Sequence, residues 1–365
     1  MKNLSNREEQ SLKKQKTALR VAVFFIIAAL LFAYFNRVFS ISGSDSNRQI
    51  FNAFYSEKEN TIDVLYLGTS ASNRYFISPI AYKETGMTAF TLATMGMPLF
   101  FVPNLIEEAE KTQDPELYII ELRSVVKDKD MITDAHIRRV TDSMKFSSNR
   151  TDAVKKALEF TEGAQGTDVG DSFLEYYLPI VKYHSRLIQG DISLSEWLLE
   201  NQENRTKGYV TSKSTLTQRA QEEAVYSNER EALADEALQT LEEVLDYCDS
   251  LDKEVLFVLS PFSVKEDQVG QFNTVIDTVE ERGYTVLNFN TEEMIEELGI
   301  DWDTDFYNSK HVNYLGAEKY TEYLTSYIEE HYDLDDHRGE ASCESYEEAY
   351  QYYQDFVSKG IQTVE

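Results

Sequence analysis

The sequence has few of the residues that mark metal, redox and nucleotide sites. It has two cysteines, Cys248 and Cys343, and no C-x-x-C pair, which excludes zinc ribbons and thioredoxin-like redox motifs. No G-x-x-x-x-G-K-[ST] and no G-x-G-x-x-G segment occurs, so nothing indicates a nucleotide-hydrolysing or dinucleotide-binding enzyme. Basic residues number 35 against 64 acidic ones, a net charge of −29. Phosphate backbones repel a chain this acidic, so we expect no nucleic-acid partner.

The rest of the composition is that of a folded protein. Of the 365 residues, 42% are hydrophobic and 12% are aromatic, which is too apolar for a disordered chain. The length suffices for one large α/β domain, or for two small ones, with a sizeable core.

The N-terminus combines a basic segment with an apolar one. Residues 1–20 carry six basic and two acidic side chains, and the next 16 residues, Val21–Asn36, are uncharged. A membrane-spanning helix needs about 20 apolar residues, so the span requires that Arg37 snorkels and that Val38–Ile41 joins it. Basic residues before a span indicate a cytoplasmic N-terminus. We therefore predict a cytoplasmic tail over 1–20, a transmembrane anchor over 21–41 and an extracellular body.

Two other interpretations of this segment stay open. It could be a signal peptide, cleaved after Ser40-Ile41-Ser42, which would also export the acidic body. It could also be a buried core helix, although its basic flank does not suit a core. In an exported chain the two cysteines could form a disulfide. We favour a buried core thiol for Cys248, which lies on the apolar face of a helical pattern.

The body alternates apolar runs with helical patterns. Five runs predict strands: 62–67, 88–94, 117–122, 255–259 and 284–289. Helices are predicted over 152–160, 173–188 (kinked or split at Pro179), 231–251, 265–282 and 316–331. This alternation predicts a flavodoxin-like, doubly wound parallel sheet, whose active crevice lies beyond the carboxyl ends of its strands.

The remaining segments complete the domain plan. Residues 42–60 are predicted to be a tether, and 61–335 the main domain. A mostly polar, helical insertion over about 124–230 is a candidate lid for the crevice. The acidic tail over 336–365 contains a helix, 344–359, with one aromatic face. We expect that face to dock onto the domain, and a partner-binding helix is the alternative.

Ser70 is the first candidate for chemistry. It follows the first strand in Gly68-Thr69-Ser70, at the expected carboxyl edge of the sheet and the start of the next helix. Backbone N–H groups at such a helix end can stabilise an oxyanion. The segment is not a G-x-S-x-G elbow, because Ser72 stands where the second glycine belongs. The alternative role for Ser70 is a helix N-cap.

His311 is the second candidate. It lies in DWDTDFYNSKHVNYLGAEKY, on an expected loop before a late helix, where an imidazole could be a base or a solvated side chain. Asp301, Asp303 and Asp305 in the same stretch mimic the start of a calcium-binding loop. The sequence lacks the glycine and the glutamate of an EF-hand, so we reject that interpretation.

Together these segments resemble the SGNH (GDSL-type) hydrolase superfamily. The resemblance spans residues 61–330 and is closest to a membrane-anchored Gram-positive branch related to D-alanyl-lipoteichoic-acid-transfer proteins. It rests on DVLYLGTSASNRYFISP, TLATMGMP and DFYNSKHVNYLGAEKYTEYL, with YLPIVKYHSRL and TKGYV in the insertion. It implies Ser70 as nucleophile, His311 as general base and the N–H of Gly96 in the oxyanion hole. It implies no metal and no organic cofactor.

The chain also departs from the family pattern. The aspartate expected three residues before the histidine is Asn308, and the one before the nucleophile is Thr69. Asn308 can hold an imidazole but cannot offset its positive charge, and Asp305 is the candidate substitute. The Gly-x-Asn block is missing, and Arg123 at the end of the third strand could stabilise an oxyanion or form a salt bridge.

Two residues of the insertion are further candidates. His184 and Arg186 are singled out by YLPIVKYHSRL as crevice residues. The alternative for His184 is a buried structural histidine, because it lies three residues after Val181 on an apolar helix face.

The resemblance implies acyl transfer at the outer face of the membrane. The expected function is a serine esterase or O-acyltransferase that acts on ester-linked acyl groups of cell-envelope glycans or teichoic-type polymers. A multi-pass membrane O-acyltransferase is a candidate partner. The alternative is a weak or inactive SGNH-fold protein that binds glycan or scaffolds such a partner. A plain membrane-tethered structural protein is a third interpretation, weakened by the pairing of the Ser70 and His311 segments.

Overall fold

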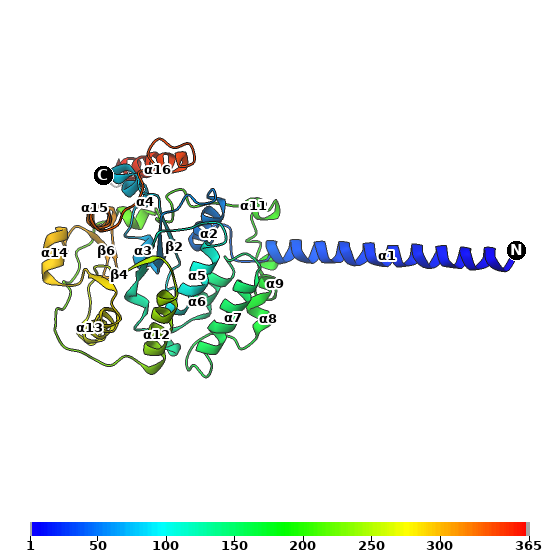
Figure 1. Ribbon diagram of the computed structural model, residues 1–365, viewed down its shortest axis with the longest axis horizontal. Coiled ribbons are helices and arrows are strands. Elements are labelled where there is room, and N and C mark those ends of the chain that lie inside the picture. Colours follow the sequence, from blue (N-terminus) through cyan, green and yellow to red (C-terminus); the bar gives the residue numbers. More distant parts are fainter. Residues whose placement is uncertain (1, 363–365) are drawn as a thin grey trace.

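A parallel sheet of five strands organises the chain in the computed structural model (Figure 1). The structure describes residues 2–362, with side chains from 10 to 360. The strands lie in the order β2-β1-β3-β4-β5, and every neighbouring pair is parallel. The bounds are β1 (Val64–Gly68), β2 (Ala89–Ala93), β3 (Leu117–Glu121), β4 (Glu254–Leu259) and β5 (Thr285–Asn288). All five predicted strands are confirmed, with ends displaced by at most two residues.

Helices cover both faces of this sheet. Leu65 and Leu67 lie in one core cluster, whereas Val64 and Tyr66 lie in the other, because successive side chains point to opposite faces. The first core includes α2 (Ser46–Ser56), α5 (Val102–Ala109), α7 (Ser148–Phe160), α12 (Asp235–Asp249) and α13 (Glu266–Glu281). The second includes α3 (Ser70–Asn73), α4 (Ser78–Thr85), α14 (Glu292–Leu298), α15 (Tyr314–His331) and α16 (Glu344–Gln362). Burial on both faces explains why the strands are continuous apolar runs.

The N-terminal helix α1 (Lys2–Val38) projects from the domain as a single rod (Figure 1). Its part from Gln10 to Val38 is long and apolar enough to cross a membrane, and the most apolar window is not buried. The predicted anchor over 21–41 ends too late, since the helix stops at Val38. Phe39 and Ile41 are buried in the domain instead.

Residues 42–60 do not form the predicted tether. Asp45 accepts hydrogen bonds from two backbone N–H groups and so caps α2. The apolar side chains of this helix recur three and four residues apart and are fully buried beside β2: Ile50, Phe51 and Phe54. This spacing places α2 in the core, and the prediction missed it because polar residues separate the apolar ones.

The insertion is helical in its first part only. Its further helices are α6 (Asp134–Thr141), α8 (Phe173–Tyr177), α9 (Pro179–Tyr183), α10 (Arg186–Gln189) and α11 (Leu194–Trp197). The predicted helix 173–188 is split, because Pro179 begins a new helix. From 198 to 234 the described chain contains no α-helix, so the helical prediction is wrong there. Within this stretch the backbone carbonyl of Lys207 accepts a hydrogen bond from the N–H of Thr91, and so the chain covers the outer edge of β2.

The tail docks onto the domain, as expected. Tyr346 and Tyr353 of α16 are fully buried, and the Tyr346 ring lies 5.2 Å from that of Tyr82 in α4. Both cysteines are buried free thiols, and Cys248 belongs to the core as expected.

Candidate active site

Ser70 and His311 meet at the carboxyl edge of the sheet, although 241 positions separate them in the chain. The Ser70 Oγ lies 2.8 Å from His311 Nε2. Ser70 is the first residue of α3, directly after β1, and is half-buried. This position follows from the parallel sheet, because the carboxyl ends of its strands share one edge.

The hydroxyl of Ser70 is not a helix cap. The side chain of Thr69 caps α3, because its Oγ1 accepts the N–H of Ala71 at 3.1 Å. The N-cap alternative for Ser70 is therefore wrong. Gly68 permits the sharp turn, since a Cβ there would lie 2.4 Å from Ser72 Oγ and 2.5 Å from Glu121 Cβ.

His311 lies on a short hairpin and not on the expected loop. The hairpin joins β6 (Phe306–Asn308) to β7 (His311–Val312), and Asn308 pairs with His311 across it. Asn308 Oδ1 lies 3.0 Å from His311 Nδ1 and also accepts the N–H of Lys310 at 2.9 Å. With two N–H groups aimed at it, this oxygen stays turned toward the imidazole.

The electrostatic surroundings keep His311 neutral. Burial, followed by the charges of Arg123, Arg74 and Lys310, lowers the pKa of His311 to about 3. The Tyr307 ring stacks on the imidazole at 5.4 Å. Because Nδ1–H donates to Asn308, Nε2 keeps the lone pair that accepts the Ser70 proton. The site therefore has the tautomer of a general base, but a base of low proton affinity.

Asp305 does not contact His311 and so does not take the place of the expected aspartate. Its buried carboxylate pairs with Lys319 at 2.6 Å and accepts the N–H of Asp301 at 2.8 Å and the hydroxyl of Thr304 at 3.1 Å. The suggestion that Asp305 substitutes for the missing aspartate is wrong, because these contacts hold its carboxylate within the turn formed by residues 301–305.

Gly96 lies at the same edge of the sheet as Ser70. The loop after β2 is tied to β1 by the N–H of Thr94, which donates to Gly68 O at 3.2 Å. Gly96 has a φ of 71°, and a Cβ there would lie 2.4 Å from the Nε2 of His136. Among the described residues, neither the Gly96 N–H nor the Ser70 N–H donates a hydrogen bond. Both are therefore available to an oxyanion.

Arg123 is a clamp and not a salt-bridge partner. Its guanidinium donates to the carbonyls of Lys310 at 2.6 Å, Pro261 at 2.7 Å and Ser260 at 3.1 Å, and to the Tyr75 hydroxyl at 2.8 Å. Its hydrogen-bond partners are carbonyls and one hydroxyl, and none of the described carboxylates forms an ion pair with it, so the salt-bridge alternative is wrong. Arg123 joins the end of β4 to the hairpin that carries His311.

No protein-family model and no curated protein matches the chain.

His184 and Arg186 do not reach this edge. His184 is exposed, which overturns both its crevice role and its buried structural role, and its Nδ1 contacts Val181 O. Arg186 is buried between Ser40 O at 2.8 Å and Glu196 at 2.9 Å. Both belong to the part of the insertion that contacts the end of α1.

Sequence reasoning missed several cations around the site. Lys127 donates to Gly96 O at 3.2 Å, and Arg139 donates to Met95 O at 3.0 Å. Burial, with the charges of Lys310 and Arg139, lowers the pKa of Lys127 to about 8. The position of Lys310, directly before His311, was the one available signal. The partners of the other two are backbone carbonyls, which no residue pattern reveals.

One group of possible metal ligands lies elsewhere, in the strap before α16. The ligand atoms of His337, Glu340 and Cys343 lie within 4.8 Å of one another. His337 already bridges Asp63 at 3.1 Å and Glu340 at 3.2 Å, and these carboxylates raise its pKa against the effect of burial. An imidazole that bridges two carboxylates accounts for this cluster without a metal.

Proposed function

We propose that the protein is a membrane-anchored, extracellular serine esterase or O-acyltransferase acting on ester-linked acyl groups of cell-envelope glycans or teichoic-type polymers. The observation that carries the proposal is the relay from Ser70 Oγ through His311 to Asn308, with contacts of 2.8 and 3.0 Å. A hydroxyl, a base and an orienting group within hydrogen-bond reach form the arrangement of nucleophilic catalysis.

The fold supports an SGNH-type assignment. The strand order 2-1-3-4-5 is that of flavodoxin-like sheets, whose sites lie outside the carboxyl ends near the switch between β1 and β3. Ser70 follows the end of β1 after one residue, and this position supports its proposed role as nucleophile.

The proposed reaction has two acyl-transfer steps. His311 Nε2 takes the proton of Ser70 Oγ as this oxygen attacks the ester carbonyl. The N–H groups of Ser70 and Gly96 stabilise the tetrahedral oxyanion. Its collapse breaks the ester bond, and the departing alkoxide takes the proton from His311. Water or a sugar hydroxyl then attacks the acyl-Ser70, gives its proton to His311, and releases the free acid or the new ester as Ser70 Oγ recovers the proton.

The charges around the site favour an anionic polymer over a neutral glycan. In a chain of net charge −29, the charged groups that act on the pKa of His311, after burial, are all cations, namely Arg123, Arg74 and Lys310. Lys127 and Arg139 add two more at the Gly96 loop. A local positive field attracts phosphate-bearing chains, which supports a teichoic-type substrate.

The site is connected to the end of α1 by a short series of contacts. Arg48 of α2 donates to Ile41 O, just beyond α1, and the adjacent Asn47 accepts the N–H of Met95 at 2.8 Å. If α1 anchors the chain with its N-terminus inside, these contacts put the Gly96 loop near the outer membrane surface. A multi-pass membrane O-acyltransferase that supplies acyl groups there is the proposed partner for the transferase route.

A second candidate function is a weak or inactive SGNH-fold protein that binds glycan or scaffolds such a partner. The neutral Asn308 and the pKa of about 3 at His311 favour it, because neither stabilises the imidazolium that forms during attack.

Covalent labelling of Ser70 separates the two candidates. The full chain in detergent is treated with a fluorophosphonate and assayed with p-nitrophenyl acetate. We expect labelling and turnover that Ser70→Ala abolishes and His311→Ala strongly reduces. Ser72→Ala is the matched control, because Ser72 lies two residues further along α3 with a buried hydroxyl that bonds to nothing described. No labelling and no turnover in folded protein would favour the binding protein.

A further inference from the structure

Outside α1, large apolar side chains are exposed mainly in one part of the insertion. Outside α1, the described residues include ten exposed large hydrophobic side chains, and seven of them fall between 174 and 199. Ile188 is 88% exposed and Leu194 is 74% exposed. The seven are Leu174, Val181, Leu187, Ile188, Leu194, Leu198 and Leu199. Such a concentration on a soluble surface indicates an interaction site.

This segment lies where α1 joins the domain. Tyr34 of α1 donates its hydroxyl to Trp197 O at 2.8 Å, and Asn36 accepts the N–H of Ile180 at 3.2 Å. The ring of Phe39, just after α1, meets that of Trp197 at 6.1 Å. Figure 1 shows α8, α9 and α11 gathered beside the end of α1. The exposed residues therefore lie at the level where the apolar helix leaves the domain.

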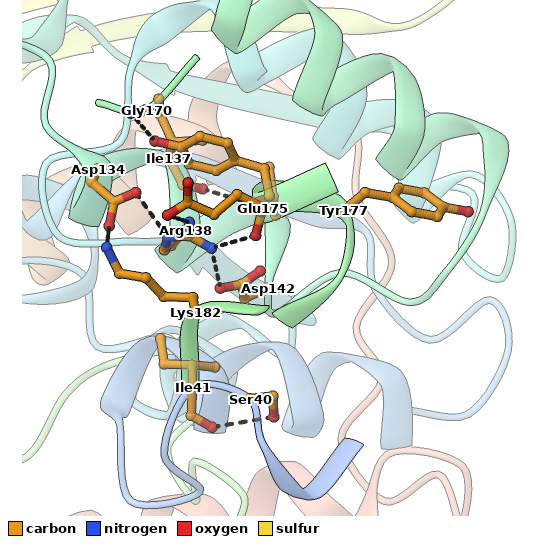
Figure 2. Close-up of polar contacts among 12 residues, drawn as sticks. Ser40, Ile41, Asp134, Ile137, Arg138, Asp142, Gly170, Glu175, Tyr177 and Lys182 are labelled. Atoms are coloured by element: carbon orange, nitrogen blue, oxygen red, sulfur yellow. Dashed lines mark hydrogen bonds and ion pairs between the residues drawn. The ribbon is translucent and has the colours of Figure 1, made fainter. Parts of the chain in front are cut away.

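An ionic network centred on the buried Arg138 holds this part of the insertion in place (Figure 2). Arg138 of α6 contacts Asp134 at 2.8 Å, Glu175 of α8 at 3.3 Å and Asp142 at 3.6 Å. Lys182 of α9 pairs with Asp134 at 3.0 Å. The network and the buried Tyr176 fix α8 and α9 against the domain, and this placement leaves Leu174 and Val181 exposed.

We propose that residues 174–199 form a membrane-contacting collar that inserts its apolar side chains into the interfacial region of the bilayer around α1. The occupant is lipid, because the collar continues the surface of the apolar helix and is attached to it. Tyr34 and Trp197 at the junction are the residue types that gather at membrane–water interfaces. An apolar face of short helices at that level lies in the plane of the interface.

The collar fixes how the domain sits on the membrane. A single helix alone would let the domain swivel, whereas a second, lateral contact restrains it. The inference rests on the proposed anchoring by α1, and it concerns the orientation of the domain and not the reaction at Ser70.

The test uses the full chain in phosphatidylcholine–phosphatidylglycerol vesicles. Both native cysteines are buried, so a polarity-sensitive thiol dye can be placed selectively at Ile188→Cys or Leu194→Cys. Met131→Cys and Val225→Cys are matched controls, because they are exposed apolar positions outside the collar. A quencher carried on the lipid chains should quench the collar dyes at least threefold more than the control dyes. Aqueous iodide should show the reverse order.

Three results would overturn the collar. In the first, the chain floats with the vesicles, but iodide quenches the Ile188 dye as strongly as the Val225 dye. This result overturns the collar and leaves the anchor intact. In the second, iodide quenches the collar dye in pure lipid vesicles but not in native membranes. This result assigns the surface to a protein partner and not to lipid. Failure of the chain to float overturns the anchor and the collar together, and leaves the proposed chemistry at Ser70 to its own labelling test.

Discussion

Asn308 holds His311 in the tautomer that a general base needs, yet it carries no charge to stabilise the protonated ring. Its Oδ1 lies 3.0 Å from His311 Nδ1, and the N–H of Lys310 occupies the same oxygen. In a Ser-His-Asp enzyme, replacing the aspartate with asparagine costs about 10⁴ in turnover through the wrong tautomer. Here the backbone N–H of Lys310 keeps the Asn308 oxygen turned toward His311, which prevents the wrong tautomer. The remaining difference from an aspartate is the missing negative charge.

The first prediction is that Asn308→Asp increases activity. A carboxylate beside Nδ1 stabilises the imidazolium and raises the pKa of His311, and general-base catalysis is worth about 10²–10⁴ in rate. We expect that Asn308→Asp recovers part of this effect and raises kcat for p-nitrophenyl acetate at least tenfold. Asn308→Ala, which removes the oxygen, should lower kcat. Equal activity in all three proteins would contradict a base role for His311.

The second prediction concerns pH. The pKa of His311 is lowered from 6.5 to about 3, so the folded protein keeps the base neutral while the unfolded chain binds a proton below 6.5. Its contribution to stability is therefore full above pH 6.5 and is lost as pH falls toward 3. The profile of kcat/KM should lack an acidic limb near pH 6.5 and should decline only toward pH 3. Asn308→Asp should move that limb upward. A wild-type limb near 6.5 would show that His311 titrates normally.

The third prediction is that Arg123 positions His311 without taking part in the reaction. Lys cannot reach the carbonyls of Ser260, Pro261 and Lys310 together, so Arg123→Lys should cost about 1–3 kcal/mol of unfolding free energy. The looser hairpin should lower kcat with little change in KM. Arg230→Lys is the control, because that exposed pair with Asp277 should contribute little to stability. A change in KM alone would assign Arg123 to substrate binding.

The sequence predicts the sheet well and the site in part. The five strands are recognisable because runs such as Val64–Leu67 are buried on both faces and stay apolar throughout. Ser70 and His311 could be proposed because one follows the first strand and the other precedes the last helix of the main domain. The hairpin that carries His311 was missed, because its strands span three and two residues and have no periodicity to detect.

Other features escaped for different physical reasons. Arg123 contacts backbone carbonyls, which every residue has, so nothing in the sequence indicates its partners. Asp305 lies six positions before His311, a spacing that allows contact, but Lys319 takes its carboxylate. Arg186 was assigned to the crevice because the sequence does not show that the helix after α9 turns toward the end of α1.

The fourth prediction separates two effects of a side chain at Gly96, the conformational penalty of its positive φ and the steric clash with His136. Gly96 and Gly163 have the same φ of 71°, but only at Gly96 would a Cβ meet another group, the ring of His136 at 2.4 Å. Gly163→Ala should therefore show the conformational penalty alone, about 1–2 kcal/mol. Gly96→Ala should lose more, because His136 or the loop must move, and the displaced N–H should slow fluorophosphonate labelling of Ser70 severalfold. Thermal unfolding and labelling rates of the two variants provide the comparison. If both are destabilised equally and label at the wild-type rate, the Gly96 N–H has no place in the oxyanion hole.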